Sequence, residues 1–289
     1  MSETATQKSR TTKTADKTDA KTVQTQDQPK ASAPTASAAS DIPAASPTGG
    51  TASPLFYGAP APLDRERHKD MRLDRDKGLH FAGTAQFIPA LHEEFAEACR
   101  SLPVLFLPGA GAPAPVFLCG MEAGENRFVD TEGVWTGAYV PAYLRRYPFI
   151  LGEVENEDAI ICIDEGAAVL SRETGERLFT DDAKETETLT NAIALTNEYF
   201  AASKRTEALV SQITALGLLQ PIAVQTRDAA GAARSIQGLL AVDERRLAEL
   251  SDEDFLALRR TGALPALYAH LMSLAQIERL QPGDAKAAA

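Results

Sequence analysis

The second half of the chain places apolar side chains at the period of an α-helix. Between about residues 184 and 216 the repeating positions stand three, four or seven apart: Leu189, Ile193, Thr196, Phe200, Ser203, Val210, Ile213 and Leu216. Residues three and four apart share one helical face, so this spacing predicts one long helix, or two helices broken near Ser203. We expect Asp182 to cap its start, with Glu185 reaching back, and Gly217 to end it.

Shorter elements surround this long helix. Three short helices are predicted after it, because Asp and Ser suit the N-cap position and Pro suits the first helical turn. Asp243 is expected to cap a helix over 244–250, Ser251 to cap one over 252–260, and Pro265 to open one that ends at about 280. Apolar runs separated by turn residues predict hairpins of 104–107 with 116–121, 149–154 with 159–163, and 222–227 with 234–242. Hairpin-joined strands followed by segregated helices indicate an α+β fold with a largely antiparallel sheet, a long helix and C-terminal helices.

Residues 1–53 differ in composition from the rest. They are mostly Thr, Ala, Ser, Lys, Gln, Asp and Pro, and Val23 and Ile42 are their only large aliphatic residues after Met1. Such a segment buries too little apolar surface to offset its ordering entropy, so we expect a disordered, low-complexity N-terminal tail. Residues 54–289 are long enough for a single domain with a sizeable core.

The acidic charge of the chain lies outside this tail. The tail has six basic and five acidic residues, a net charge of +1. Because the whole chain has a net charge of −11, the residues after the tail carry a net charge of −12. Nucleic acids and anionic membrane surfaces bind clustered Lys and Arg. We therefore expect no nucleic-acid partner.

We expect no secretory signal and no membrane insertion, because no apolar run reaches the length that either requires. The three cysteines, Cys99, Cys119 and Cys162, are widely spaced and odd in number. They fit a reducing compartment and match neither a disulfide framework nor a zinc site. The expected location is the cytoplasm, with signal-less export to the cell surface as the alternative.

The segment 135–149, WTGAYVPAYLRRYPF, is the densest in aromatic residues. It holds the only tryptophan and three of the six tyrosines, and its prolines predict a short helix between Pro141 and Pro148. Tyrosines beside arginines can bind sugars or peptides by stacking and hydrogen bonding. The candidate binding residues are Trp135, Tyr139, Tyr143, Arg145, Arg146 and Tyr147, with an unknown protein or carbohydrate as partner. The alternative places the rings in the core and pairs Arg145 or Arg146 with an acidic residue of the sheet.

A second candidate site rests on histidines. His68 and Asp70 form an H-x-D motif, which together with His270 has the residue types of a two-His-one-carboxylate iron site. Arg279 stands nine residues beyond His270, as an acid-binding arginine would in a 2-oxoglutarate oxygenase. Against this, about 200 residues separate the two halves, and His270 lies beside a leucine stripe, where a structural histidine is commoner.

The chain resembles the SapC family of bacterial proteins. The pieces that carry the resemblance run in order along the chain: PLFY at 54–57, ERHKD at 66–70, EFAEA at 94–98, NRFVD at 126–130, Trp135, YVPAYLRRYPF at 139–149, CIDE at 162–165, GERLF at 175–179, VDE at 242–244 and YAHL at 268–271. The family is named for a bacterial surface-layer gene cluster. The resemblance implies no reaction and brings no catalytic residues.

These observations favour a non-catalytic accessory or binding protein linked to the bacterial cell surface. The sequence contains no G-x-S-x-G, P-loop, G-x-G-x-x-G or C-x-x-C motif, so we expect no cofactor. The alternative is a metal-dependent enzyme, similar to a 2-oxoglutarate and iron oxygenase, that uses His68, Asp70 and His270.

Overall fold

The computed structural model describes residues 54–109, 111–152, 159–227 and 233–280, all of which belong to one compact unit, Asp41–Ala289. The expected disordered tail, residues 1–53, lies outside the described residues. The assignment of 54–289 to a single domain stays a prediction.

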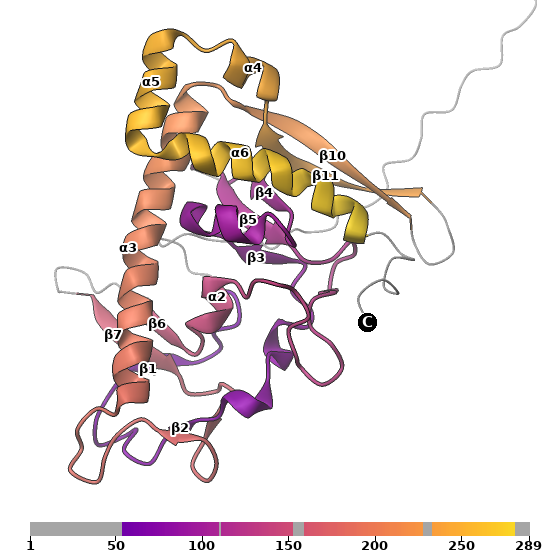
Figure 1. The fold of residues 1–289 in the computed structure, drawn as a ribbon. Helices are drawn as coiled ribbons and strands as arrows, with labels where there is room; N and C mark the ends of the chain where they lie inside the picture. The colour runs from indigo at the N-terminus through magenta and orange to yellow at the C-terminus, as the bar shows by residue number, and fades with distance from the viewer. Residues whose placement is uncertain (1–53, 110, 153–158, 228–232, 281–289) are drawn as a thin grey trace, which may run out of the picture. The chain divides into compact units, whose positions relative to one another are not determined.

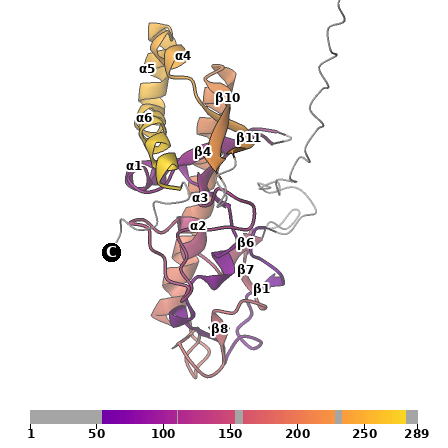
Figure 2. The same ribbon diagram turned by 90° about the vertical axis from the view of Figure 1, so that its right-hand side faces the viewer.

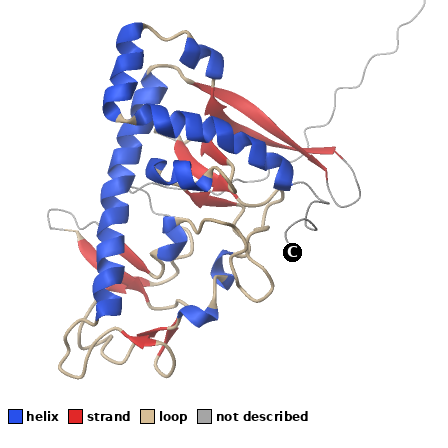
Figure 3. Cartoon of the chain, viewed as in Figure 1, coloured by secondary structure: helices blue, strands red, loops and turns tan. Residues whose placement is uncertain are grey.

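The strands of the described chain pair in antiparallel fashion into three sheets, as the hairpin pattern predicted (Figure 1, Figure 3). The largest sheet contains all four strands of the first and last predicted hairpins. In spatial order the sheets are β10 (Leu219–Arg227), β11 (Ala233–Val242), β4 (Val104–Leu107), β5 (Ala114–Leu118) and β3 (Phe87–Pro89); β1 (Pro60–Pro62), β7 (Ile160–Asp164) and β6 (Phe149–Gly152); and β8 (Leu170–Ser171), β2 (Arg72–Leu73) and β9 (Glu176–Arg177).

The five-stranded sheet is covered on both faces. Phe106 on β4 and Phe117 on β5 point into the main core, whereas Leu105 and Val116 point into a second cluster on the other face. This explains why β4 is apolar at every position instead of alternating, since all four of its side chains are buried.

Helix α3 (Glu187–Ala215) is a single unbroken helix, and it packs against a strand of each of the three sheets, β5, β6 and β9 (Figure 1, Figure 2). Ser203 does not interrupt it, because its hydroxyl donates to the carbonyl of Phe200 within the helix. Gly217, with a φ of +64°, follows its end as predicted. No helix in the described ranges has the length and apolar character needed to cross a membrane.

The start of α3 differs from the prediction. Thr186, not Asp182, is the cap, and its hydroxyl accepts a hydrogen bond from the backbone N–H of Leu189. The helix cannot begin earlier, because Glu185 is still extended and forms a β-bridge with Phe179.

Helices α4 (Glu244–Ala248) and α5 (Asp252–Thr261) begin where the sequence predicted, whereas the last helix begins at Ala263, two residues before the predicted Pro265. Asp243 and Ser251 cap α4 and α5, and Gly262 ends α5 in the left-handed region. The last predicted helix divides at Leu274 into an α-helix and a 3₁₀-helix that covers the outer face of the five-stranded sheet. The helices not yet introduced are α1 (Phe95–Ala98), α2 (Ala142–Arg145), α6 (Ala263–Ser273), and the 3₁₀-helices η1 (Arg75–Lys77), η2 (His80–Ala82), η3 (His92–Glu94) and η4 (Leu274–Leu280).

Candidate functional site

Helix α2 lies inside the aromatic candidate segment and carries Tyr143 and Arg145, and a buried carboxylate holds its first turn. Pro141 stands at the N-cap, one position before the helix. Oε1 of Glu94 accepts hydrogen bonds from the N–H of Ala142 at 2.7 Å and the hydroxyl of Tyr139 at 2.8 Å, while Oε2 accepts the N–H of Leu91 at 2.8 Å. Burial raises the pKa of Glu94, and these hydrogen bonds act in the opposite direction.

Three of the six predicted binding residues form a connected group at the partly exposed side of this segment. The indole of Trp135 stacks on Phe128 with a centroid separation of 5.3 Å, and its Nε1 donates to the carbonyl of Tyr139. Arg145 is exposed and donates from Nη2 to the Tyr139 hydroxyl at 3.0 Å. The local network therefore fixes Trp135, Tyr139 and Arg145 with respect to one another.

The other three predicted residues, Tyr143, Arg146 and Tyr147, are buried. Tyr147 stacks on Phe81 with a centroid separation of 4.2 Å, and its hydroxyl donates to Oδ2 of Asp164 at 3.0 Å. Asp164, only 2% exposed, also accepts the backbone N–H of Ala59 at 2.8 Å. This carboxylate thus ties the segment 54–62 and the aromatic segment to strand β7.

The guanidinium of Arg146 is surrounded by tyrosine rings. It lies 4.2 Å from the ring centroid of Tyr199, 4.6 Å from that of Tyr143 and 5.5 Å from that of Tyr57. We call Arg146, Tyr57, Tyr143 and Tyr199 the tyrosine–arginine cluster. Its members come from three distant segments: residues 54–59 before β1, which we call the strap, helix α2 with its C-cap Arg146, and helix α3.

Hydrogen bonds hold two of these rings in place. The hydroxyl of Tyr57 donates to the carbonyl of Phe149 at 2.7 Å, and that of Tyr143 donates to the carbonyl of Leu55 at 2.9 Å. Burial raises the pKa of Tyr57, Tyr143 and Tyr199, while the charge of Arg146 acts to lower it. The rings are therefore neutral around pH 7 and present their π-faces to the cation.

Arg146 has no acidic partner in the described part of the chain. Only 7% of the residue is exposed, its Nε has no hydrogen-bond partner, and none of the ion pairs found among the described residues includes it. The alternative interpretation made two statements about this segment. Its placement of the rings in the core is confirmed for Tyr143 and Phe149, whereas no pairing of Arg145 or Arg146 with an acidic residue is found among the residues that the structure describes. The guanidinium of Arg146 contacts tyrosine rings instead of the carboxylate of an acidic residue.

The structure does not bring the three predicted metal ligands together. His68 is buried in the loop before β2, where its Nε2 lies 2.9 Å from Oε1 of Glu165, and Asp70 is exposed nearby. His270 lies on α6, where its Nε2 accepts the N–H of Val242 at 3.0 Å. Across the described ranges, no three His, Cys, Asp or Glu side chains are grouped as a metal would require.

Sequence reasoning missed Tyr57, Tyr199, Glu94 and Asp164 as members of this region. Tyr57 lies in the PLFY piece and Asp164 in the CIDE piece of the family resemblance, so both were visible as parts of a pattern. Nothing local indicates that Tyr199, on a long helix, meets an arginine 53 positions earlier in the chain. That contact arises only when α3 packs beside α2.

Comparison with known proteins gives one result at the level of the family. The SapC family model matches residues 63–280, which includes almost every described residue. No curated protein and no solved structure gives a significant match.

Proposed function

The chain belongs to the SapC family, and we propose that it is a non-catalytic binding protein, linked to the bacterial cell surface, that recognises a carboxylate of its partner through Arg146. The surface association follows the gene cluster for which the family is named. The mode of recognition rests on one observation: a buried guanidinium without a carboxylate partner among the described residues.

The energetics of Arg146 support an anion as its missing partner. Burying an ion costs several kcal/mol, and each ring of a desolvated cation–π contact returns about 2 kcal/mol. The three rings therefore offset much of the cost, but they interact with the faces of the guanidinium. Its N–H groups lie in the plane of the group, and a carboxylate is the anion whose geometry matches that edge.

The cluster is also preorganised for recognition. Tyr57 and Tyr143 are fixed by their own hydrogen bonds, so binding an anion does not require ordering of these side chains. A planar, always charged arginine between fixed rings discriminates a carboxylate from a neutral group.

Calorimetric titration tests this proposal with three probes: sodium acetate, a triglutamate peptide and digalacturonate. The proposal predicts saturable binding of at least one of the two larger probes, and their comparison distinguishes a protein partner from an acidic carbohydrate. Arg146→Gln should abolish binding, whereas Arg145→Gln, which changes the exposed neighbour, should retain it. Arg146→Lys keeps the charge without the planar edge and should weaken binding at least tenfold.

Equal binding by the Arg145→Gln and Arg146→Gln variants would contradict the proposal. If Arg146→Gln fails to fold, the Lys variant and the wild-type titration decide the question. Absence of any heat with all three probes in the folded wild-type protein would also refute recognition through Arg146.

A further inference from the structure

Two hollows on the described surface share Arg75 in their lining, and neither is lined by a member of the tyrosine–arginine cluster. One is a groove of about 360 Å³ lined by Arg75, Glu176, Glu187, Thr188 and Asn191. The other is a cavity of about 50 Å³ lined by Arg75, Gly78 and the apolar side chains of Leu73, Leu79, Phe81, Leu144, Tyr147 and Val169. Arg75 is the lining residue that the two spaces share.

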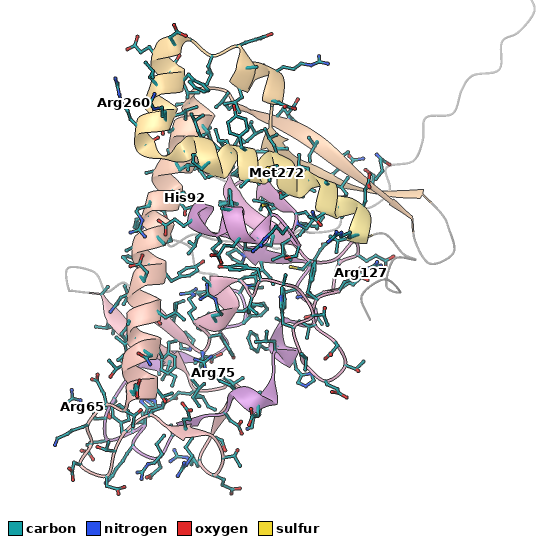
Figure 4. The ribbon with its side chains drawn as sticks, viewed as in Figure 1. Arg65, Arg75, His92, Arg127, Arg260 and Met272 are labelled. Carbon is teal, nitrogen blue, oxygen red and sulfur yellow. The ribbon has the colours of Figure 1, made fainter. Side chains whose placement is uncertain are left out.

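The groove is built by three elements that are far apart in the sequence. Arg75 begins η1, Glu176 lies on β9, and Glu187, Thr188 and Asn191 form the first turns of α3. Figure 4 shows Arg75 next to the N-terminal end of α3. Pairing of β2 with β9 places η1 and Glu176 at the same end of the small sheet.

The charged groups of the groove are of both signs. Arg75 is exposed and forms no ion pair with any acidic residue that the structure describes. Glu176 accepts a hydrogen bond from the hydroxyl of Thr188, and Glu187 is exposed at the helix start. A simple anion would meet two carboxylates here, and a simple cation would meet Arg75. A molecule with both charges is complementary to the whole groove.

The cavity adds a size limit. A water molecule needs about 10–15 Å³ of such volume, so 50 Å³ accommodates a group of a few heavy atoms and excludes an aromatic ring. Its lining is apolar apart from Arg75 and the edge of Tyr147, which favours a small aliphatic group.

We propose that this Arg75 site binds a free α-amino acid with a small aliphatic side chain. Arg75 receives the carboxylate, Glu176 and Glu187 receive the ammonium group, and the side chain enters the apolar cavity. The site differs from the Arg146 cluster in its residues and in its ligand, so the two proposals stand or fall separately.

Calorimetric titration with L-valine tests the proposal, together with two half-ligands of the same shape. Isovalerate lacks the ammonium group and isobutylamine lacks the carboxylate, so each should bind at least tenfold more weakly than valine. L-tryptophan should not bind, because its ring exceeds the cavity. Arg75→Gln and Glu187→Gln should each weaken valine binding at least tenfold.

Arg65→Gln is the matched control. Arg65 is an exposed arginine of the same region (Figure 4), but it pairs with Glu185 and does not line the groove. This variant should bind valine as the wild-type protein does. The proposal is overturned if valine gives no binding up to about 10 mM, roughly ten times a millimolar dissociation constant. It is equally overturned if isobutylamine binds as tightly as valine, or if Arg75→Gln leaves valine binding unchanged.

Discussion

His270 should make the stability of this protein depend on pH. Its ring is completely buried, packs against Phe106 at a centroid distance of 5.1 Å, and accepts the N–H of Val242 on Nε2. An accepting Nε2 places the single proton on Nδ1, so the ring is neutral. Protonation would bury a charge and direct a second N–H at the N–H of Val242.

Burial therefore lowers the pKa of His270 to about 4, against an ordinary value of 6.5. Between these values the unfolded chain binds more protons than the folded one, so the free energy of unfolding rises with pH across this window. The contribution is complete above pH 6.5 and is lost as the pH falls towards 4. At about 1.4 kcal/mol per pH unit it amounts to about 3 kcal/mol.

Urea unfolding of the wild-type protein and of His270→Gln, at several values between pH 7.5 and 4.5, measures this contribution. Glutamine does not titrate, and its amide oxygen can accept the N–H of Val242. Relative to this variant, the wild-type protein should lose most of the 3 kcal/mol over that interval. His80→Gln, at an exposed histidine, is the control. A difference between wild type and His270→Gln that stays constant with pH would refute the reasoning.

Three further predictions concern stability and are measured by urea or thermal unfolding. Thr186→Ala should lower the free energy of unfolding by about 1 kcal/mol and Asp182→Ala should leave it nearly unchanged, because only Thr186 caps α3. Equal losses in the two variants would show that Thr186 is not the residue that caps the helix. Gly262→Ala should lower the free energy of unfolding by about 1–2 kcal/mol, because alanine disfavours the left-handed φ of this position. Gly175→Ala should lower it clearly more, because the new Cβ would also lie 2.5 Å from a backbone oxygen of β2. Similar losses in the two variants would show that this steric clash is absent. Glu94→Gln should cost about 1–3 kcal/mol, because one acceptor oxygen becomes an amide facing an N–H group; an unchanged midpoint would show that the network is not needed.

Much of the fold could be predicted from the sequence because its signals are local. Helix caps such as Ser251 and apolar runs such as β4 depend on neighbours in the chain, and the structure has both where the pattern indicated. The partner strand β5 covers residues 114–118 instead of the predicted 116–121. Asp182 was a good cap by composition alone. It failed because the bridge of Glu185 to Phe179 is a tertiary contact that keeps the preceding residues extended.

The candidate site was less accessible to sequence reasoning for the same reason. The density of aromatic residues drew attention to Tyr143 and Arg146, but the pattern alone could not show that the arginine is buried against tyrosine rings instead of paired with an acidic residue. Tyr199 lies 53 residues after Arg146 in the chain, and Tyr57 lies 89 residues before it. Only packing of α3 and the strap against α2 creates that environment.

The most direct test of recognition through Arg146 is an NMR titration of the arginine side chains with the ¹⁵N-labelled wild-type protein. The Nε–H of Arg146 is buried and has no hydrogen-bond partner, so its resonance should be resolved from those of the exposed arginines. On addition of the probe that binds in calorimetry, this one signal, assigned by its loss in Arg146→Lys, should shift and saturate. If the Arg146 signal stays fixed while the probe binds, the guanidinium does not receive the carboxylate and the proposed function is wrong.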